Sequence, residues 1–379
     1  MNGERIIERL VGAVGEDRVD AGIAVCAEYR PAGGGKVMPP SFPEGPYLYE
    51  KRRVDGQWCK VVVLDQVPSQ ANRIEEALLA ARDAGRIELP LFELNVGTSR
   101  GPLRLTSLQF PHRSADAYLR DSLIGGERYD RSEIGRRLRG VTAADATPLF
   151  ERDPGSLLFG VWDSRREGRG AKFARVYSSS VVGVDPQDGV RKATRMDPLN
   201  LQGGIDDKAK AKGDWQHVAT GEKTKGQKLS EIGHGNIAPG DAHGGVAIAW
   251  AMRGAWISLA GLERVRFGDA SAEASCLARA TLAALALAGD RLAFGRPSVW
   301  LRSDCDLVRE TEVLAFDGDG GQREEFTLTA AEAIEVFHEL RDRAAKAGVV
   351  MAADTVALEP TPALSAAVEF SVTKAAAEE

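Results

Sequence analysis

A long stretch in the middle of the chain limits where a hydrophobic core can form. The segment from Asp185 to Gly245 is rich in Gly, Lys, Asp and Gln and contains few large apolar residues. Such a composition buries too little apolar surface to offset the entropy lost on ordering. We therefore expect long loops or an extended arm over about residues 185–245, projecting from a body formed by the sequence on either side.

The rest of the chain mixes strand-like and helix-like patterns without regular alternation and without a repeat of fixed period. This mixture predicts the α+β class rather than a doubly wound sheet. We expect one α+β domain over residues 1–360 and a tail over 361–379 whose end, KAAAEE, is disordered. Periodicity predicts strands at 23–29, 58–64, 87–94, 156–162, 174–184, 246–258, 298–302 and 311–316. It predicts helices at 4–14, 72–84, 114–122, 132–139, 271–289 and 330–346, the last with a capping box from Thr329 to Glu332.

Composition and the N-terminal sequence favour a cytoplasmic protein. Of 379 residues, 43% are hydrophobic, and the four cysteines form no CxxC pair, as in a reducing compartment. The N-terminal MNGERIIERLVG is charged and amphipathic, unlike a signal peptide. The apolar run from Ala280 to Ala288 is too short to span a bilayer.

Charge is distributed unevenly around a net charge of −6. The stretch from Ser164 to Lys228 has 14 basic and 8 acidic residues, a balance of +6. From Arg302 to the end there are 7 basic and 17 acidic residues, a balance of −10. This asymmetry fits an anion-binding face, an acidic face that meets the basic face of another copy, or two solvated surfaces.

Few motifs suggest catalysis, and no GxSxG, HExxH, GxGxxG or CxxC motif is present. His234 and His243 flank a glycine-rich loop, where they could join a carboxylate on a metal or bond to backbone groups. His112 is either a general base or the residue that precedes a helix N-cap at Ser114.

Four carboxylates suggest a second possible catalytic site. Asp65, Glu75, Glu76 and Asp163 could form a cluster for metal-dependent phosphodiester chemistry. Asp65 and Asp163 follow predicted strands, but nothing in the sequence brings the four residues together. We predict no catalytic residue, no metal and no cofactor.

Six segments, in this order and spacing, resemble one known family. They are LDQVPSQANRIEEAL (64–78), SLLFGVWDS (156–164), ARVYSSSVVGVD (174–185), TRMDPLN (194–200), GHGNIAP (233–239) and GGVAIAWAMRGAWISLAGLERVRFG (244–268). The family is the CRISPR-associated RAMP proteins of type I-U systems, also called type I-G. These are the GSU-type, Cas-seven-class backbone subunits of the crRNA-guided surveillance complex (Cascade).

The resemblance implies a fold, a role and a set of partners. The fold would be an RRM-like (ferredoxin-like) palm with large insertions and a projecting thumb, which we assign to about residues 190–245. Copies would stack in a helical filament along one crRNA guide with other complex subunits and present its bases to target DNA, without catalytic duty. The alternative is a RAMP-type ribonuclease that processes crRNA with a histidine such as His112, or cleaves RNA with a metal.

A subunit of this kind must hold the guide by its backbone, because base pairing reads the target. The connector DQVPSQANR provides hydrogen-bonding groups and a cation at a helix start, where free N–H groups favour phosphate. Alternatively, Ser69 is a helix N-cap, and Asn72 and Arg73 face water. We predict RNA contacts from Ser69, Gln70, Asn72, Arg73, Arg165, Arg166, Arg191, Lys192, Arg195, Lys223, Lys225 and Lys228.

Overall fold

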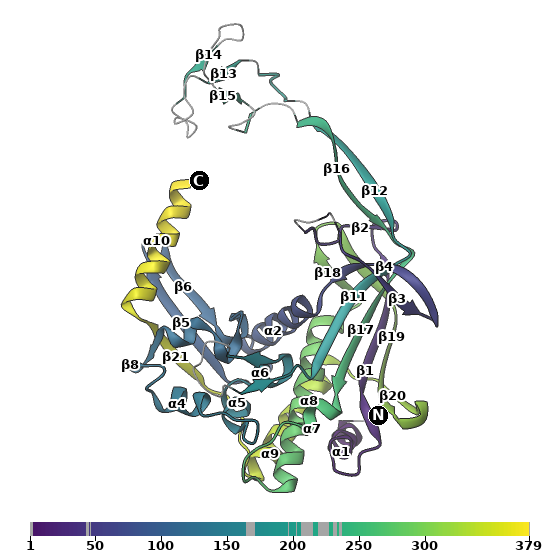
Figure 1. The fold of residues 1–379 in the computed structure, drawn as a ribbon, viewed down its shortest axis with the longest axis vertical. Coiled ribbons are helices and arrows are strands. Elements are labelled where there is room, and N and C mark those ends of the chain that lie inside the picture. Colours follow the sequence, from purple (N-terminus) through teal and green to yellow (C-terminus); the bar gives the residue numbers. More distant parts are fainter. Residues whose placement is uncertain are drawn as a thin grey trace.

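The computed structural model (Figure 1) contains one large sheet, one small sheet and a long arm. It describes residues 3–42, 45, 47–163, 171–195, 197–201, 203–205, 215–218, 227–229, 233–234 and 237–378. Within these ranges, the side chains of 191–195, 227–228, 237–243 and 375–378 lie outside the described part.

The large sheet is antiparallel throughout and has β18 and β3 at the ends of its path. Its strands lie in the order β18 (Ser298–Arg302), β19 (Cys305–Gly318), β1 (Asp20–Pro31), β17 (Trp250–Ser258), β11 (Tyr177–Val184), β4 (Gln57–Asp65) and β3 (Tyr49–Val54). A further strand, β20 (Arg323–Phe326), pairs with β19 off this path.

Four adjacent strands of this sheet have the order of a ferredoxin-like fold. Numbered along the chain, β1, β11, β17 and β19 lie in the spatial order 4-1-3-2. The arm leaves between the second and third of these strands, and helix α8 (Ala272–Phe294) links the third and fourth. The expected α+β, RRM-like palm with large insertions is confirmed.

Helices α1 (Gly3–Ala13), α2 (Val67–Asp83), α8 and α9 (Ala330–Lys346) pack with this sheet into one core. Alternation along β1 supplies inward-facing residues such as Ile23, Val25 and Tyr29. By length and composition α8 could cross a membrane, but 67% of its most apolar window is buried inside the protein. The helix therefore has the environment of a core helix.

A second, five-stranded sheet lies on the other side of α2 from the large sheet (Figure 1). Its order is β6 (Gly101–Thr106), β5 (Leu91–Thr98), β21 (Thr355–Pro360), β7 (Ser122–Ile124) and β8 (Glu127–Arg128). Strand β21 runs parallel to β5 and antiparallel to β7. Helix α10 (Pro362–Glu378) follows, so the expected disordered end at KAAAEE is helical as far as Glu378.

Several short helices lie between the longer elements, and one of them corrects a strand prediction. They are α3 (Ala117–Arg120), α4 (Glu133–Arg139), α5 (Thr147–Arg152), α6 (Pro154–Phe159) and α7 (Leu259–Glu263). The stretch 156–162, predicted as a strand, is mostly α6, because Asp153 caps the backbone N–H of Ser156 and Pro154 stands in the first turn. Only β9 (Val161–Trp162) is extended, and it pairs with β10 (Lys172–Phe173).

The arm is a two-stranded ribbon that extends away from the body (Figure 1). Strands β12 (Gln187–Arg195) and β16 (Ile237–Ala247) pair along its stem, and β2 (Lys36–Val37) pairs with β16 at its root. Its far end carries β13 (Gly204–Ile205), β14 (His217–Val218) and β15 (Gln227–Lys228). Backbone hydrogen bonds hold such a ribbon without a core, so the segment poor in apolar residues is the expected arm.

Candidate nucleic-acid interface

The start of α2 offers polar groups that no other part of the described chain uses. Helix α2 begins at Val67 with Gln66 as its N-cap, and no side chain caps it. Ser69 is half-buried and Asn72 is exposed, and within the described residues neither side chain has a hydrogen-bond partner. Uncapped N–H groups and a positive helix end favour an anion at this corner.

Arg73 lies one turn further along and is held in place by two contacts. Its Nε donates to Asp65 Oδ2 at 2.8 Å, and its Nη2 donates to the carbonyl of Leu301 in β18 at 2.8 Å. The side chain is 25% exposed. Because two of its nitrogens are fixed, the guanidinium has a set orientation and Nη1 remains for another acceptor.

Asp65, at the end of β4, interacts with two arginine side chains. Its carboxylate is 1% exposed and accepts a hydrogen bond from Gln70 Nε2 at 2.5 Å in addition to that from Arg73. Arg302 Nη2 lies 3.6 Å from Asp65 Oδ1. One carboxylate therefore faces two guanidinium groups, and the charges of these three side chains sum to +1.

Gln70 does not face solvent, so its predicted direct contact with RNA is wrong. Its side chain is fully buried, and its amide oxygen accepts hydrogen bonds from Ser179 Oγ at 2.8 Å and Arg253 Nε at 3.1 Å. Gln70 lies four residues before Ile74 on the buried face of α2. The helical period could have placed it inside.

A buried ionic network lies below this corner, and sequence reasoning missed it. Arg253, in β17, donates to Tyr177 Oη at 2.7 Å and pairs with Asp290 of α8. Asp290 also pairs with Arg291, which binds Glu312 of β19 at 2.7 Å. Burial raises the pKa of Asp290, but the charges of Arg253 and Arg291 outweigh it and hold the pKa well below its usual range.

A signal for Arg253 was present in the sequence. Within AWAMRGAWIS, alternation places it on the same strand face as Ala251, Ala255 and Ile257, all of which are buried. A charged residue in such a register implies a buried partner.

The remaining predicted contacts lie on the arm or outside the described part of the chain. Backbone pairing places Arg191, Lys192 and Arg195 along the stem strand β12, and Lys228 in β15 at the far end. Their side chains lie outside the described part, as do residues Arg165, Arg166, Lys223 and Lys225. The RNA contacts of these eight residues stay predictions.

Two of the four carboxylates considered for catalysis are engaged by arginines. Asp65 binds Arg73, and Glu75 forms two hydrogen bonds with Arg113, at 2.7 and 3.0 Å. Burial raises the pKa of Glu75 to about 7, although the charge of Arg113 lowers it. Among the described residues, no group of three or more His, Cys, Asp or Glu side chains could hold a metal ion.

The histidines do not form a common site in the described part of the chain. His112 is exposed and precedes a short 3-10 helix that starts at Arg113, while Asp116 caps α3. The ring of His234 lies 6.0 Å from that of Trp215, centroid to centroid. The side chain of His243 lies outside the described part, so its predicted pairing with His234 stays a prediction.

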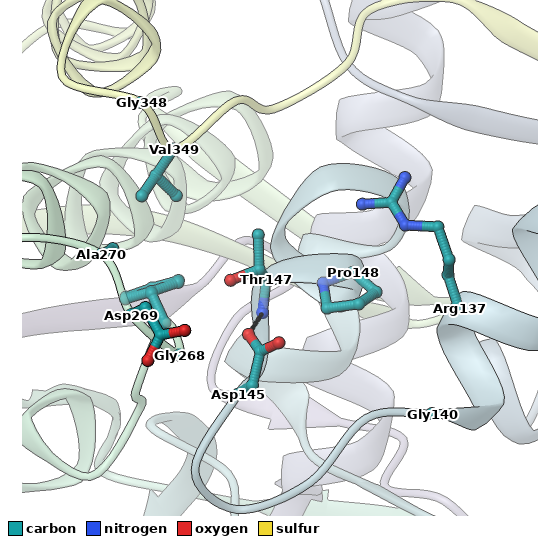
Figure 2. Close-up of a pocket in the computed structure, with 11 residues that line it drawn as sticks. Arg137, Gly140, Asp145, Thr147, Pro148, Gly268, Asp269, Ala270, Gly348 and Val349 are labelled. Atoms are coloured by element: carbon teal, nitrogen blue, oxygen red, sulfur yellow. Dashed lines mark hydrogen bonds between the residues drawn. The ribbon is translucent and has the colours of Figure 1, made fainter.

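Another recess, between α4, α5 and the end of α9, has three charged residues in its lining, Arg137, Asp145 and Asp269 (Figure 2). Its volume is about 460 Å³. The carboxylate of Asp145 accepts a hydrogen bond from the backbone of Thr147 at 3.0 Å, and Arg137 pairs with Glu151 at 2.5 Å. Asp269 is exposed and has no side-chain partner among the described residues.

Comparison with known proteins agrees with the resemblance seen in the sequence. Residues 23–187 match the model of a family described as CRISPR-associated protein GSU0053 (Cas_GSU0053). A comparison with curated proteins finds no match. The matched span runs from β1 to the first residue of β12 and includes the start of α2. Over this span the chain is similar to CRISPR-associated proteins of the GSU0053 type.

Proposed function

We propose that the chain is a non-catalytic, crRNA-binding backbone subunit of a type I-U (I-G) interference complex in antiviral defence. The family match supports a CRISPR-associated role and association with other CRISPR components. The RRM-like palm and the projecting arm suit a protein that holds an RNA strand.

The start of α2 is the observation that carries this proposal. Ser69 and Asn72 supply unused hydrogen-bonding groups, and Arg73 supplies an oriented cation. These groups suit phosphate and 2′-hydroxyl oxygens, which occur at every nucleotide. Such binding leaves the bases of the guide free to pair with target DNA.

The arm would extend the grip on the guide. Its stem strand β12 contains Arg191, Lys192 and Arg195 in a ribbon that projects from the palm. Cations spaced along an extended support attract a polyanion without selecting a sequence. We therefore assign the arm to the same strand of RNA as the start of α2.

Repetition along the guide would follow from contacts between copies. The stretch from Ser164 to Lys228 has a balance of +6, and that from Arg302 to the end has −10. Head-to-tail contacts between unlike surfaces build open helical assemblies when the rotation does not close. The charge asymmetry suits such contacts.

Co-purification and salt titration test the proposal. The protein is purified with its partner subunits, bound small RNA is sequenced, and affinity for a repeat–spacer RNA is measured across salt concentrations. We expect guide RNA in the complex and an affinity that falls steeply with salt. The absence of small RNA together with an affinity insensitive to salt would overturn the proposal.

Cleavage assays separate this role from that of a ribonuclease. The same RNA is incubated with the protein, with and without divalent cations, and the products are resolved by length. We expect intact RNA. Cleavage that Asp163→Ala or His112→Ala abolishes while RNA binding remains would establish the ribonuclease instead.

A further inference from the structure

A recess at the root of the arm combines an exposed indole with two carboxylates. Its volume is about 670 Å³, and its lining includes residues 32–33, strand β2 with Met38, and residues 244–245 of β16. Trp300 in β18 is 64% exposed and also lines the recess. Asp306 is its direct partner across the β18–β19 pair, so the two side chains share a face of the sheet.

The carboxylates in this recess are not neutralised by neighbours. Asp304 lies in the turn between β18 and β19, and both it and Asp306 are exposed. Within the described part of the chain, neither forms an ion pair, and neither does Lys36, the one basic residue of the lining. Two acids against one base leave the recess with excess negative charge.

This chemistry favours a cation over a nucleic acid. An exposed indole attracts a guanidinium or ammonium group to its face, and adjacent carboxylates accept its hydrogen bonds. Phosphate would meet repulsion from Asp304 and Asp306. Gly33, Gly244 and Gly245 also line the recess and add no side chains to it.

We propose that the recess around Trp300, Asp304 and Asp306 receives an arginine or lysine side chain from a second copy of this chain. The inference rests on the proposed assembly of copies along a guide and assigns one side of the contact between them. Charge complementarity supports a second copy as the occupant, because the acidic recess begins the −10 stretch and the same chain carries a +6 stretch. Its position on β18, an edge strand, also leaves the recess open to a neighbour.

Light scattering of reconstituted complexes tests this assignment. The wild type, Trp300→Ala, Trp300→Phe and the double variant Asp304→Asn/Asp306→Asn are each assembled on a guide RNA long enough for several copies. The matched control is Trp58→Ala, which removes an indole that is 72% exposed on the β3–β4 hairpin. We expect about tenfold weaker association between copies for Trp300→Ala and for the double variant. We expect little change for Trp300→Phe and for Trp58→Ala.

The outcomes separate the two proposals. If the wild type binds no RNA, or never exceeds one copy per guide, the proposed function itself is wrong. Normal assembly of the wild type, of Trp300→Ala and of the double asparagine variant would overturn the contact while leaving that function intact. Asn tolerates the left-handed backbone of Asp304, so the double variant decides the question if Trp300→Ala fails to fold.

RNA as the occupant is the remaining outcome. Affinity for an RNA that holds a single copy is measured by anisotropy for the same variants. A tenfold loss there for Trp300→Ala, with association between copies unchanged, would show base stacking and overturn the inference. Equal single-copy affinities with weaker association between copies would support it.

Discussion

At the start of α2, some side chains are available to bind a ligand, and others are buried and hold a neighbouring side chain in place. Ser69 and Asn72 have free polar groups, whereas Gln70 and Asp65 are buried and fix the guanidinium of Arg73. The sequence predicted this cluster as a unit because its residue types suit a phosphate. The inward position of Gln70 was missed because the predicted helix began at residue 72, whereas α2 begins at Val67 and places Gln70 on the same buried face as Ile74.

Removing the free groups tests their role without disturbing the fold. Ser69→Ala/Asn72→Ala should weaken binding of single-stranded RNA by about 5- to 160-fold, since each of two neutral hydrogen bonds contributes about 0.5–1.5 kcal/mol. Thermal stability should be unchanged, because neither side chain has a partner in the described structure. Anisotropy and thermal melting measure both properties. Gln57→Ala, an exposed amide at the start of β4, is the control, and equal affinities of all three proteins would contradict the assignment.

Glu75 gives a pH dependence with a definite sign. Its pKa rises from an ordinary value of 4.5 to about 7 on folding, so the folded state binds a proton that the unfolded chain releases. The contribution of Glu75 to the free energy of unfolding should therefore fall as pH rises from 4.5 to 7. The total loss is roughly 3 kcal/mol, because each pKa unit corresponds to about 1.4 kcal/mol. Glu75→Gln should lack this loss.

Urea unfolding at pH 5 and pH 7.5 measures the effect. The free energy of unfolding of the wild type, relative to that of Glu75→Gln, should decrease between the two values. A difference that is constant with pH would show that the ion pair with Arg113 cancels the effect of burial on the pKa, and one that grows as pH rises would show that the ion pair outweighs it.

Whole elements were predictable where a local signal agrees with the packing. Helix α9 begins with the capping box from Thr329 to Glu332 that the sequence indicates. The stretch 156–162 was misread because its apolar run fits a buried strand or a buried helix equally, and the cap at Asp153 decided for a helix. The expected helix at 114–122 is largely absent, because Asp116 starts only the four-residue α3.

The outward face of the palm sheet provides a test of packing between elements. Gly22 of β1 lies opposite Ser258 of β17, and a Cβ at Gly22 would overlap the indole of Trp256. Gly22→Ala should lower the free energy of unfolding by about 1–3 kcal/mol through overpacking. Trp256→Leu should restore part of this loss, which makes the two substitutions non-additive. A double-mutant cycle in urea checks this, and simple additivity would contradict it.

At the scale of the molecule, the palm and the second sheet share one hydrophobic core, and the arm projects from it (Figure 1). Low apolar content was enough to predict the arm. It was not enough to predict its pairing, because the register between β12 and β16 comes from residues far apart in the sequence. The order 4-1-3-2 of the palm likewise depends on long-range pairing that local periodicity does not encode.

The pairing of β12 with β16 allows the arm to be removed cleanly. Val190 and His243 are partners in the ribbon, so an Asn-Gly turn can replace residues 191–242 and close a shorter hairpin. The variant should keep its melting temperature within a few degrees, bind RNA at least about tenfold more weakly, and show a shallower salt dependence because fewer cations contact phosphate. Undiminished affinity and an unchanged salt slope would exclude the arm from RNA binding.

The central place of β21 has a consequence for biosynthesis. Its neighbours, β5 and β7, leave the ribosome long before Thr355 is translated, at roughly 5–20 residues per second. For roughly 10–50 s the nascent chain therefore carries the second sheet as two unconnected parts, β6–β5 and β7–β8. The unpaired strand edges of these parts can form hydrogen bonds with strands of other chains. Translation that stalls ahead of Thr355 would release a product whose palm can be largely complete while its second sheet stays open to aggregation.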